Sequence, residues 1–459
     1  MARVVVFVDH DIMVRHFVLT GVLSPLEGEH DVLYVFPEKH KRVTQDLSKL
    51  PLPRLRTVAV DTQRAYLFRR LYAATVLMRM RRTPDKRIMF RFWKQMLGPR
   101  AFYESWLHSW PWTNGRYKRR MLAQIGPNEP LDALLAEERP DVIVHPTVLE
   151  GLFVSDLAQW GERHGVPTVY LMNSWDNPAV KAIMMGPPDR LVVWGEHSRR
   201  LAHERIGVPL DRLLAFGAAQ FDVYRRAPRE SPEAYRRRLG VPDGLPILLY
   251  AGSSKGLDET RQLVELDEAI ETGRMPRCVV LYRPHPWRGK GKGEQSFFDR
   301  SWRHVVICPA MAEFYRRNWA GDDAPFMADY EETHVSLSAV DAVISPVSTI
   351  LLEAAMHGKP VVAYVGDDEG GNNLFVFTVV RTVHFREFFE RVDCPQVESI
   401  EALVPACAEL LRRAATPGTA ERMKAQCEYF VAPGERSYAD RLADLVRELA
   451  GRERAQQAG

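Results

Sequence analysis

The sequence predicts an α/β protein with two domains, each built on a parallel sheet that helices cover on both faces. Its 459 residues are too many for one ordinary domain. Short apolar runs alternate with amphipathic segments along most of the chain, which is typical of parallel sheets. Near the middle, the charged stretch 224–244, "YRRAPRESPEAYRRRLGVPDG", interrupts this alternation as a linker does. Two such domains predict a ligand cleft between them.

The elements follow from the pattern in chain order. The first domain is expected over residues 1–228, with strands at 3–9, 30–36, 54–60, 141–146, 167–174, 189–195 and 213–217, and helices at 11–26, 130–140, 153–165 and 196–207. The second is expected over 229–430, with strands at 246–252, 277–286, 304–309, 341–346 and 360–365, and a helix at 350–358. Residues 431–459 predict a C-terminal amphipathic helix with a polar tail.

Composition narrows the class of protein. Hydrophobic residues make up 46% of the chain and charged residues 26%, as in a soluble globular enzyme. No apolar run reaches the ~18–20 residues of a membrane-spanning helix, and the first residues predict a strand rather than a signal peptide. The five cysteines show no CxxC spacing. We therefore expect buried free thiols, no metal site and a cytoplasmic location.

A basic and aromatic segment, residues 64–120, interrupts the first domain. It contains fifteen Lys or Arg and two acidic residues, a net charge of +13 in a chain whose total is +3. Twelve Phe, Tyr or Trp residues lie among them. The pattern favours a helical insert that meets an anionic membrane surface, with the cluster Arg79, Arg81, Arg82, Lys86 and Arg87 supplying attraction. A plain helical subdomain with an aromatic core is the alternative, and nucleic acid is a weaker one.

Polar residues end the strands of the second domain, where α/β sheets bind ligands. "YRPHPW" carries Arg283 and His285, held by two prolines and suited to a phosphate. "SPVSTILLE" offers Ser345, Ser348 and Thr349 to a phosphate at a helix N-terminus, and Glu353 to two ribose hydroxyls. "GSSKGLDE" adds Ser253 and Lys255. "DDEGGNN", residues 367–373, is either an acceptor loop or an acidic surface loop.

Candidate bases come from the first domain, because a base that acts on an acceptor hydroxyl should lie opposite the nucleotide. They follow the first strand and the strands at 141–146 and 167–174: Asp9, His10, Asp11, His145, Glu150 and Asp176. The sequence does not choose among them. Asp11 also suits a helix cap.

"RPHP" followed some sixty residues later by "SPVSTILLEAAMHGKPVV" resembles the second domain of GT-B glycosyltransferases. The set with this resemblance includes CDP-glycerol glycerophosphotransferases, HP-motif bacterial Kdo and sialic acid transferases, and UDP-GlcNAc 2-epimerases. Residues 173–224 resemble bacterial surface-carbohydrate proteins of the same architecture, so the resemblance covers roughly 140–365. It implies two Rossmann-like domains facing across a cleft, with His285, Ser348 and Thr349 at the nucleotide phosphate and Glu353 at the ribose.

Together these observations lead us to expect a metal-independent transferase, peripheral on the inner face of the membrane, that moves a sugar from a nucleotide-sugar to a surface glycan or lipid-linked acceptor. Three alternatives stay open. They are a CDP-glycerol-type glycerophosphotransferase, a UDP-sugar 2-epimerase and a non-catalytic nucleotide-binding subunit. The donor base, the sugar and the acceptor are not specified by the sequence.

Overall fold

The computed structural model describes residues 1–81, 83, 86–181, 184–253, 259–286, 296–320, 329–366 and 379–457. The chain forms two compact units, Met1–Asp222 with Tyr429–Gly459 (unit 1) and Val223–Glu428 (unit 2). The sequence predicts domain boundaries after residues 228 and 430, whereas the compact units change after residues 222 and 428. None of the helices in the described ranges has the length and hydropathy needed to span a lipid bilayer.

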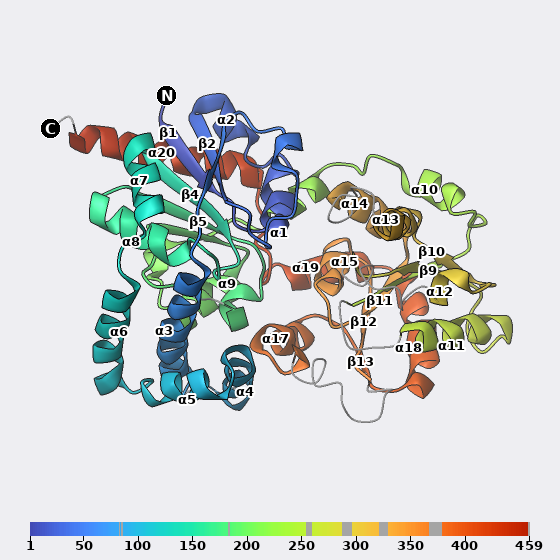
Figure 1. The fold of residues 1–459 in the computed structure, drawn as a ribbon. Coiled ribbons are helices and arrows are strands. Elements are labelled where there is room, and N and C mark those ends of the chain that lie inside the picture. The colour runs from blue at the N-terminus through green and yellow to red at the C-terminus, as the bar shows by residue number, and fades with distance from the viewer. Residues whose placement is uncertain are drawn as a thin grey trace. The chain divides into compact units, whose positions relative to one another are not determined.

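Unit 1 is built on a seven-stranded sheet in which every described pair is parallel, in the order β3-β2-β1-β4-β5-β6-β7 (Figure 1). The strands are β1 (Arg3–Phe7), β2 (Asp31–Pro37), β3 (Leu55–Val58), β4 (Val142–Thr147), β5 (Thr168–Met172), β6 (Arg190–Val193) and β7 (Leu213–Ala215). The order reverses between β1 and β4, and this switch point is where doubly wound sheets bind ligands.

Helices cover both faces of this sheet. They are α1 (Asp11–Met13), α2 (Ser24–Glu29), α7 (Glu129–Glu138), α8 (Val154–His164), α9 (Glu196–Leu201) and α20 (Tyr438–Gln457). Three π-helical turns, η1 (Val14–Val18), η3 (Asn177–Lys181) and η4 (Ala202–Ile206), and three 3₁₀ turns, η2 (Leu47–Lys49), η5 (Leu210–Arg212) and η6 (Ala219–Arg225), join them. The single helix expected at 11–26 is therefore broken, with Gly21 at a φ of 74° between its two parts.

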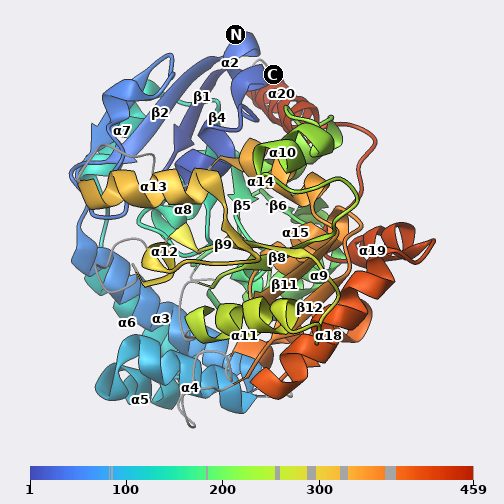
Figure 2. The same cartoon turned by 90° about the vertical axis from the view of Figure 1, so that its right-hand side faces the viewer.

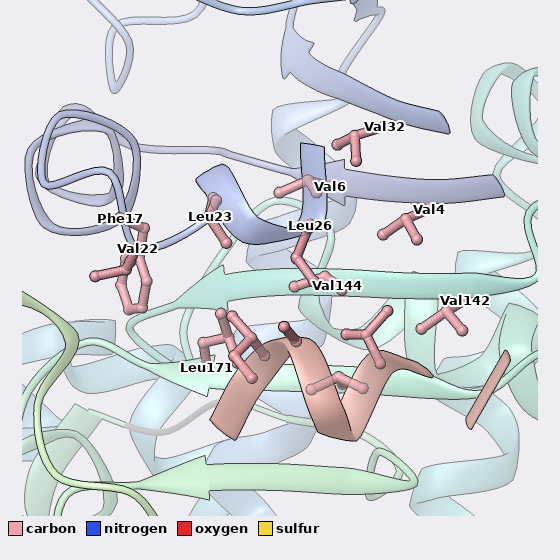
Figure 3. Packing of buried hydrophobic residues seen from close by; sticks show 14 of the residues in the cluster. Val4, Val6, Phe17, Val22, Leu23, Leu26, Val32, Val142, Val144 and Leu171 are labelled. Carbon is pink, nitrogen blue, oxygen red and sulfur yellow. The ribbon is translucent and has the colours of Figure 1, made fainter. Parts of the chain in front are cut away.

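The last helix, α20, completes the core of unit 1. Alternate strand residues such as Val4, Val6, Val142 and Val144 point to one face of the sheet and are fully buried. Figure 3 shows these four valines within the buried cluster, to which Leu442 and Val446 of α20 also belong. The expected C-terminal helix is thus part of the first compact unit rather than a separate segment.

The basic segment between β3 and α7 is helical, as the sequence predicts. It forms α3 (Thr62–Met80), α4 (Lys86–Leu97), α5 (Pro99–Leu107) and α6 (Pro111–Ile125). In Figure 1 these helices extend away from the strands of unit 1, and the α5–α6 connection lies at the remote end. Tyr72, Trp93, Phe102 and Tyr117 form part of the buried core of the segment.

Unit 2 repeats the architecture with six parallel strands in the order β10-β9-β8-β11-β12-β13. These are β8 (Ile247–Ala251), β9 (Val279–Arg283), β10 (Val305–Ile307), β11 (Ala342–Pro346), β12 (Val361–Tyr364) and β13 (Gln396–Val397). The order reverses between β8 and β11, so this sheet has its own switch point.

The helices of unit 2 lie on both sides of its strands in the view of Figure 2. They are α10 (Pro232–Arg238), α11 (Glu259–Glu271), α12 (Ser296–Asp299), α13 (Pro309–Ala320), α14 (Tyr330–Ala339), α15 (Ile350–Met356), α17 (Val383–Arg391), α18 (Ile400–Ala414) and α19 (Thr419–Cys427). All five cysteines are in this unit, buried and without a disulfide.

Candidate functional site

In unit 1, His145 lies near the end of β4 and is completely buried. Its Nδ1 is 2.8 Å from the carbonyl oxygen of Phe7. Since a carbonyl can only accept, Nδ1 carries the proton, and the neutral ring presents Nε2 as a proton acceptor. That Nε2 is buried and has no hydrogen-bond partner among the described residues. Burial lowers the pKa of His145, and the nearby carboxylate of Asp9 opposes this shift. A neutral imidazole with an unused lone pair can act as a base.

Asp9 follows β1, the strand next to β4, and is also completely buried. Its Oδ2 accepts a 2.6 Å hydrogen bond from the backbone N–H of Leu152, whereas Oδ1 has no partner in the described part of the chain. A Cβ atom at Gly151 would lie 2.2 Å from Oδ2, so a larger residue there would displace this carboxylate. The loop after β4 is therefore shaped around this carboxylate.

The other expected bases are already engaged. His10 accepts a 3.1 Å hydrogen bond from the N–H of Ile12 and caps α1, a role that the sequence also suggests for Asp11. Burial lowers the pKa of His10, and Asp9 again opposes the shift. Asp11 instead accepts from the N–H and hydroxyl of Thr44, at 2.9 and 2.5 Å, and so fastens the loop after β2.

Glu150 and Asp176 lie at the ends of β4 and β5. Glu150 is bonded to the guanidinium of Arg69, and that of Arg42 lies 3.9 Å away. Asp176 is half-buried and accepts a 3.1 Å hydrogen bond from the side-chain amide of Asn177. These contacts make both carboxylates less available to accept a proton from a substrate than Asp9 and His145 are.

Two polar residues that the sequence analysis did not single out complete the edge of the unit 1 sheet. Asn173 follows β5 and is buried with its Oδ1 unpartnered within the described ranges. His16 lies in η1, and burial lowers its pKa well below the usual value. π-Helical turns often mark functional sites. We call Asp9, His10, His16, His145 and Asn173 the unit 1 edge cluster.

In unit 2, β8 and β9 end beside each other, since Ala251 pairs with Arg283. The Arg283 guanidinium donates a 2.8 Å hydrogen bond to the hydroxyl of Thr333 on α14, which fixes its direction. The loop that follows is anchored by Tyr315 of α13, whose hydroxyl donates to the carbonyl of His285 at 2.7 Å. Both expected phosphate ligands of this loop are thus held at the carboxyl edge of the sheet. Trp287, the last residue of the stretch "YRPHPW", lies outside the described residues.

The loop after β8 is organised by Glu259, a buried carboxylate that the sequence analysis gave no role. It accepts from the N–H of Ser253 and from the hydroxyl of Tyr282, both at 2.7 Å. A Cβ at Gly252 would meet Glu259 Oε2 at 2.4 Å, so a larger residue there would displace the Glu259 carboxylate. Ser253 is held at the sheet edge by this bond. Lys255 and residues 367–373, which the sequence also proposed for the site, lie outside the described residues.

The serine loop after β11 divides into two parts. Ser345 is buried and donates its hydroxyl proton to the carbonyl of Ala251 at 2.7 Å, so it ties β11 to β8. Ser348 and Thr349 are half-buried at the start of α15. We therefore assign Ser345 to the sheet and keep Ser348 and Thr349 as the candidate hydroxyl ligands.

Glu353 lies one turn into α15 and is 8% exposed. Its Oε2 accepts a 2.6 Å hydrogen bond from the hydroxyl of Tyr224, a residue of the linker that the sequence analysis did not name. Burial and the Glu353 carboxylate raise the pKa of Tyr224 well above its usual value, so the phenol stays a donor. The Tyr224 ring packs against His334 and His357, with ring centres 5.2 and 4.4 Å apart.

Within the described ranges, no group of three or more His, Cys, Asp or Glu side chains is arranged to hold a metal ion. The two edges instead present hydrogen-bonding and proton-accepting groups. These groups suit the binding of a phosphate ester and the removal of a proton.

Comparisons with known proteins agree with the two-unit α/β architecture. No family model matches the chain. No curated protein matches its sequence. Among solved structures, MnaA of S. aureus with UDP matches at a TM-score of 0.52 and 10% identity, covering 98% of this chain and 96% of that chain. A putative UDP-N-acetylglucosamine 2-epimerase from Listeria monocytogenes matches at 0.51 and 11%, covering 96% and 94%.

The wall teichoic acid polymerase TagF, in a variant soaked with CDPG, matches at a TM-score of 0.50 and 11% identity, covering 98% of this chain and 89% of that chain. These structural neighbours are GT-B fold enzymes. The chain therefore has the GT-B fold, as the resemblance in its sequence implies.

Proposed function

We propose that the protein is a glycosyltransferase that moves a sugar from a nucleotide-sugar to a surface glycan or lipid-linked acceptor. The observation that supports this proposal is that the two sheets present different kinds of polar group at their carboxyl edges. One switch point has buried proton acceptors, and the other has groups suited to phosphate and ribose. A transfer to a hydroxyl needs both kinds of group.

The nucleotide is assigned to unit 2. Arg283 and His285 neutralise the phosphates, and Ser348 and Thr349 donate to them at the start of α15. Glu353, oriented by Tyr224, accepts from the ribose hydroxyls. MnaA was solved with UDP and TagF with CDPG, which supports a nucleotide ligand for this fold.

The proton is assigned to unit 1. In the proposed reaction the acceptor oxygen attacks the anomeric carbon while the bond from that carbon to the phosphate oxygen breaks. Nε2 of His145 takes the acceptor proton, and Asp9 stabilises the imidazolium that results. The nucleotide leaves with the bonding electron pair on its phosphate, which Arg283 stabilises in place of a metal ion.

A CDP-glycerol-type glycerophosphotransferase is the second candidate, and the likeness to TagF favours it. The acceptor oxygen would then attack phosphorus and release CMP. The likeness to the putative epimerase from Listeria monocytogenes keeps a UDP-sugar 2-epimerase as a third. A binding subunit without catalysis is the fourth.

A thermal-shift panel of CMP, CDP, UDP and GDP tests the nucleotide site. A ligand at a hundred times its dissociation constant should add about 2.7 kcal/mol to the free energy of unfolding. We expect at least one nucleotide to stabilise the protein. If none does, the proposal is wrong.

Product analysis with the preferred nucleotide then separates the four candidates. Acceptor-dependent release of nucleotide with a new glycosidic bond identifies the glycosyltransferase. Release of CMP with a new phosphodiester identifies the second candidate, and sugar isomerisation without acceptor identifies the third. Binding without any turnover of the matching donors identifies the fourth.

A further inference from the structure

The end of α5 and the start of α6 expose large apolar side chains. Their exposed fractions are 54% for Tyr103, 36% for Trp106, 59% for Leu107, 42% for Trp110 and 77% for Trp112. We call these five residues the aromatic tip. Single exposed apolar residues are ordinary, but five within ten positions of the sequence form a patch of the kind that marks an interaction site.

The aromatic tip is held in place by specific contacts. The Arg81 guanidinium lies over the rings of Trp106 and Trp110, at 5.2 and 4.1 Å. It also donates to the hydroxyl of the buried Ser109, at 2.7 Å from Nη2. Asn114 donates to the carbonyl of His108 at 3.1 Å, so the turn between the helices is braced from both sides. The exposure of these rings is therefore a feature of the folded insert.

The basic residues that the sequence predicts to attract a membrane, between positions 79 and 87, do not all have that role in the structure. Arg79 donates to the carbonyl of Arg205 at 3.1 Å and lies against Gly207, while Arg81 supports the aromatic tip. Neither is the free surface charge that the sequence analysis expected of it, and Arg82 lies outside the described residues. Lys86 and Arg87 are exposed at the start of α4.

The surface beside the aromatic tip is positively charged. Arg116, Lys118, Arg119 and Arg120 are exposed on α6. Between residues 86 and 128 the sequence has one acidic residue, Glu104, and its carboxylate is bonded to Arg70. Apolar and indole side chains bordered by cations match an anionic bilayer, where Trp and Tyr favour the headgroup level and Lys and Arg meet lipid phosphates.

We infer that the aromatic tip inserts into the interface of an anionic lipid bilayer, with the basic residues of α6 against the headgroups. This deepens the proposed function, because a lipid-linked acceptor is presented at such a surface, but it stands on the insert alone. Leu107 and Trp112 supply apolar contact that salt does not weaken. The charges of α6 supply attraction that salt screens.

Co-flotation with vesicles tests the inference in the absence of any donor. Wild-type protein should float with phosphatidylcholine vesicles that contain phosphatidylglycerol, much less with phosphatidylcholine alone, and should partly release in high salt. The double variant Leu107→Ser/Trp112→Ser should lower the partition coefficient at least tenfold and keep its salt dependence. The matched control Leu19→Ser/Leu210→Ser changes residues that are 56% and 44% exposed elsewhere in unit 1, and should bind as wild type does.

A second variant separates charge from apolar contact. Replacing Arg116, Lys118, Arg119 and Arg120 with Gln should lower binding to anionic vesicles more than a hundredfold at low salt, given about 1 kcal/mol for each cation near the surface. It should also remove most of the salt dependence.

Three outcomes overturn the inference. They are no flotation of folded wild-type protein at low salt, equal flotation of the Leu107/Trp112 variant, and self-association through the aromatic tip without lipid binding. Nucleotide thermal shifts and turnover on a soluble acceptor should be unchanged in these variants. Failure of membrane binding therefore leaves the transferase proposal intact, and failure of nucleotide binding leaves this inference intact.

Discussion

The carboxyl edges of the two sheets differ in how their buried polar groups are used. In unit 1, Asp9 Oδ1, His145 Nε2 and Asn173 Oδ1 have no protein partner among the described residues. In unit 2, the corresponding side chains are paired, Arg283 with Thr333 and Glu353 with Tyr224. A buried polar atom without a partner costs free energy and needs a reason, and a reacting proton is one such reason. Paired side chains hold fixed directions, which suits binding.

The largest expected effect comes from removing the proposed base. His145→Gln should lower turnover by about 10²–10⁴-fold and leave nucleotide affinity unchanged, because the amide cannot take the acceptor proton. The control His164→Gln changes a histidine at the end of α8 whose Nδ1 makes a similar 2.9 Å contact to a carbonyl. Steady-state kinetics and nucleotide titration measure both. Near-normal turnover of His145→Gln would show that His145 is not the base and that the unit 1 edge does not supply it in this way.

The pH dependence of turnover gives a second measure of the same group. Burial lowers the pKa of His145 below the usual 6.5. The neutral, active form should therefore persist below pH 6.5, and turnover should fall only as the pH drops through the lowered value. Asp9→Asn removes the charge that raises this pKa, so the acid limb should move to still lower pH. An acid limb that moves upward in Asp9→Asn would contradict the assignment.

An intermediate effect is expected in unit 2. Glu353→Gln and Arg283→Gln should each weaken nucleotide binding by about 1.5–3 kcal/mol, the cost of one charged hydrogen bond. The surface pair of Glu265 and Arg274, 2.7 Å apart, supplies matched controls, Glu265→Gln and Arg274→Gln. Calorimetric titration with the nucleotide found in the thermal-shift panel measures the loss. Unchanged nucleotide affinity in both site variants would show that Glu353 and Arg283 do not contact the nucleotide.

The smallest effect should come from Tyr224→Phe, which removes one hydrogen bond to Glu353 without changing the carboxylate. Nucleotide affinity should fall by about 1 kcal/mol, less than in Glu353→Gln. Tyr170→Phe is the control, since its hydroxyl bonds the carbonyl of Val154 in unit 1. That variant should lower the free energy of unfolding and leave nucleotide affinity unchanged. If both variants lose nucleotide affinity equally, the effect of Tyr224 is on folding.

Much of the fold could be predicted because buried parallel strands are short apolar runs, visible without knowledge of their neighbours. The residues after each strand were visible for the same reason, so Asp9, His145, Arg283 and Glu353 all appear at the expected edges. Long-range partners were not visible. Ser345 bonds to the carbonyl of Ala251, but nothing in the local sequence distinguishes it from Ser348. The sequence around Glu259 likewise does not indicate that its carboxylate accepts a hydrogen bond from the N–H of Ser253.

The basic insert shows the same limit. Composition indicates that aromatic and basic residues lie together, but it cannot divide the aromatics between a core and a surface. The structure buries Tyr72 and Trp93 and exposes Trp110 and Trp112. Both alternatives for this segment, an aromatic core and an exposed apolar surface, thus describe different parts of it.

The position of α20 has a consequence for the order of events during synthesis. Unit 2 is inserted within the sequence of unit 1, and α20 comes after it in the chain. The strands of unit 1 therefore leave the ribosome long before the helix that covers their apolar face. At ~5–20 residues per second, the roughly two hundred residues of unit 2 delay that helix by about 10–40 s. Until then Val4, Val6, Val142 and Val144 lack the part of their cover that α20 supplies, and transiently exposed apolar surface of this kind makes an incomplete chain prone to aggregation.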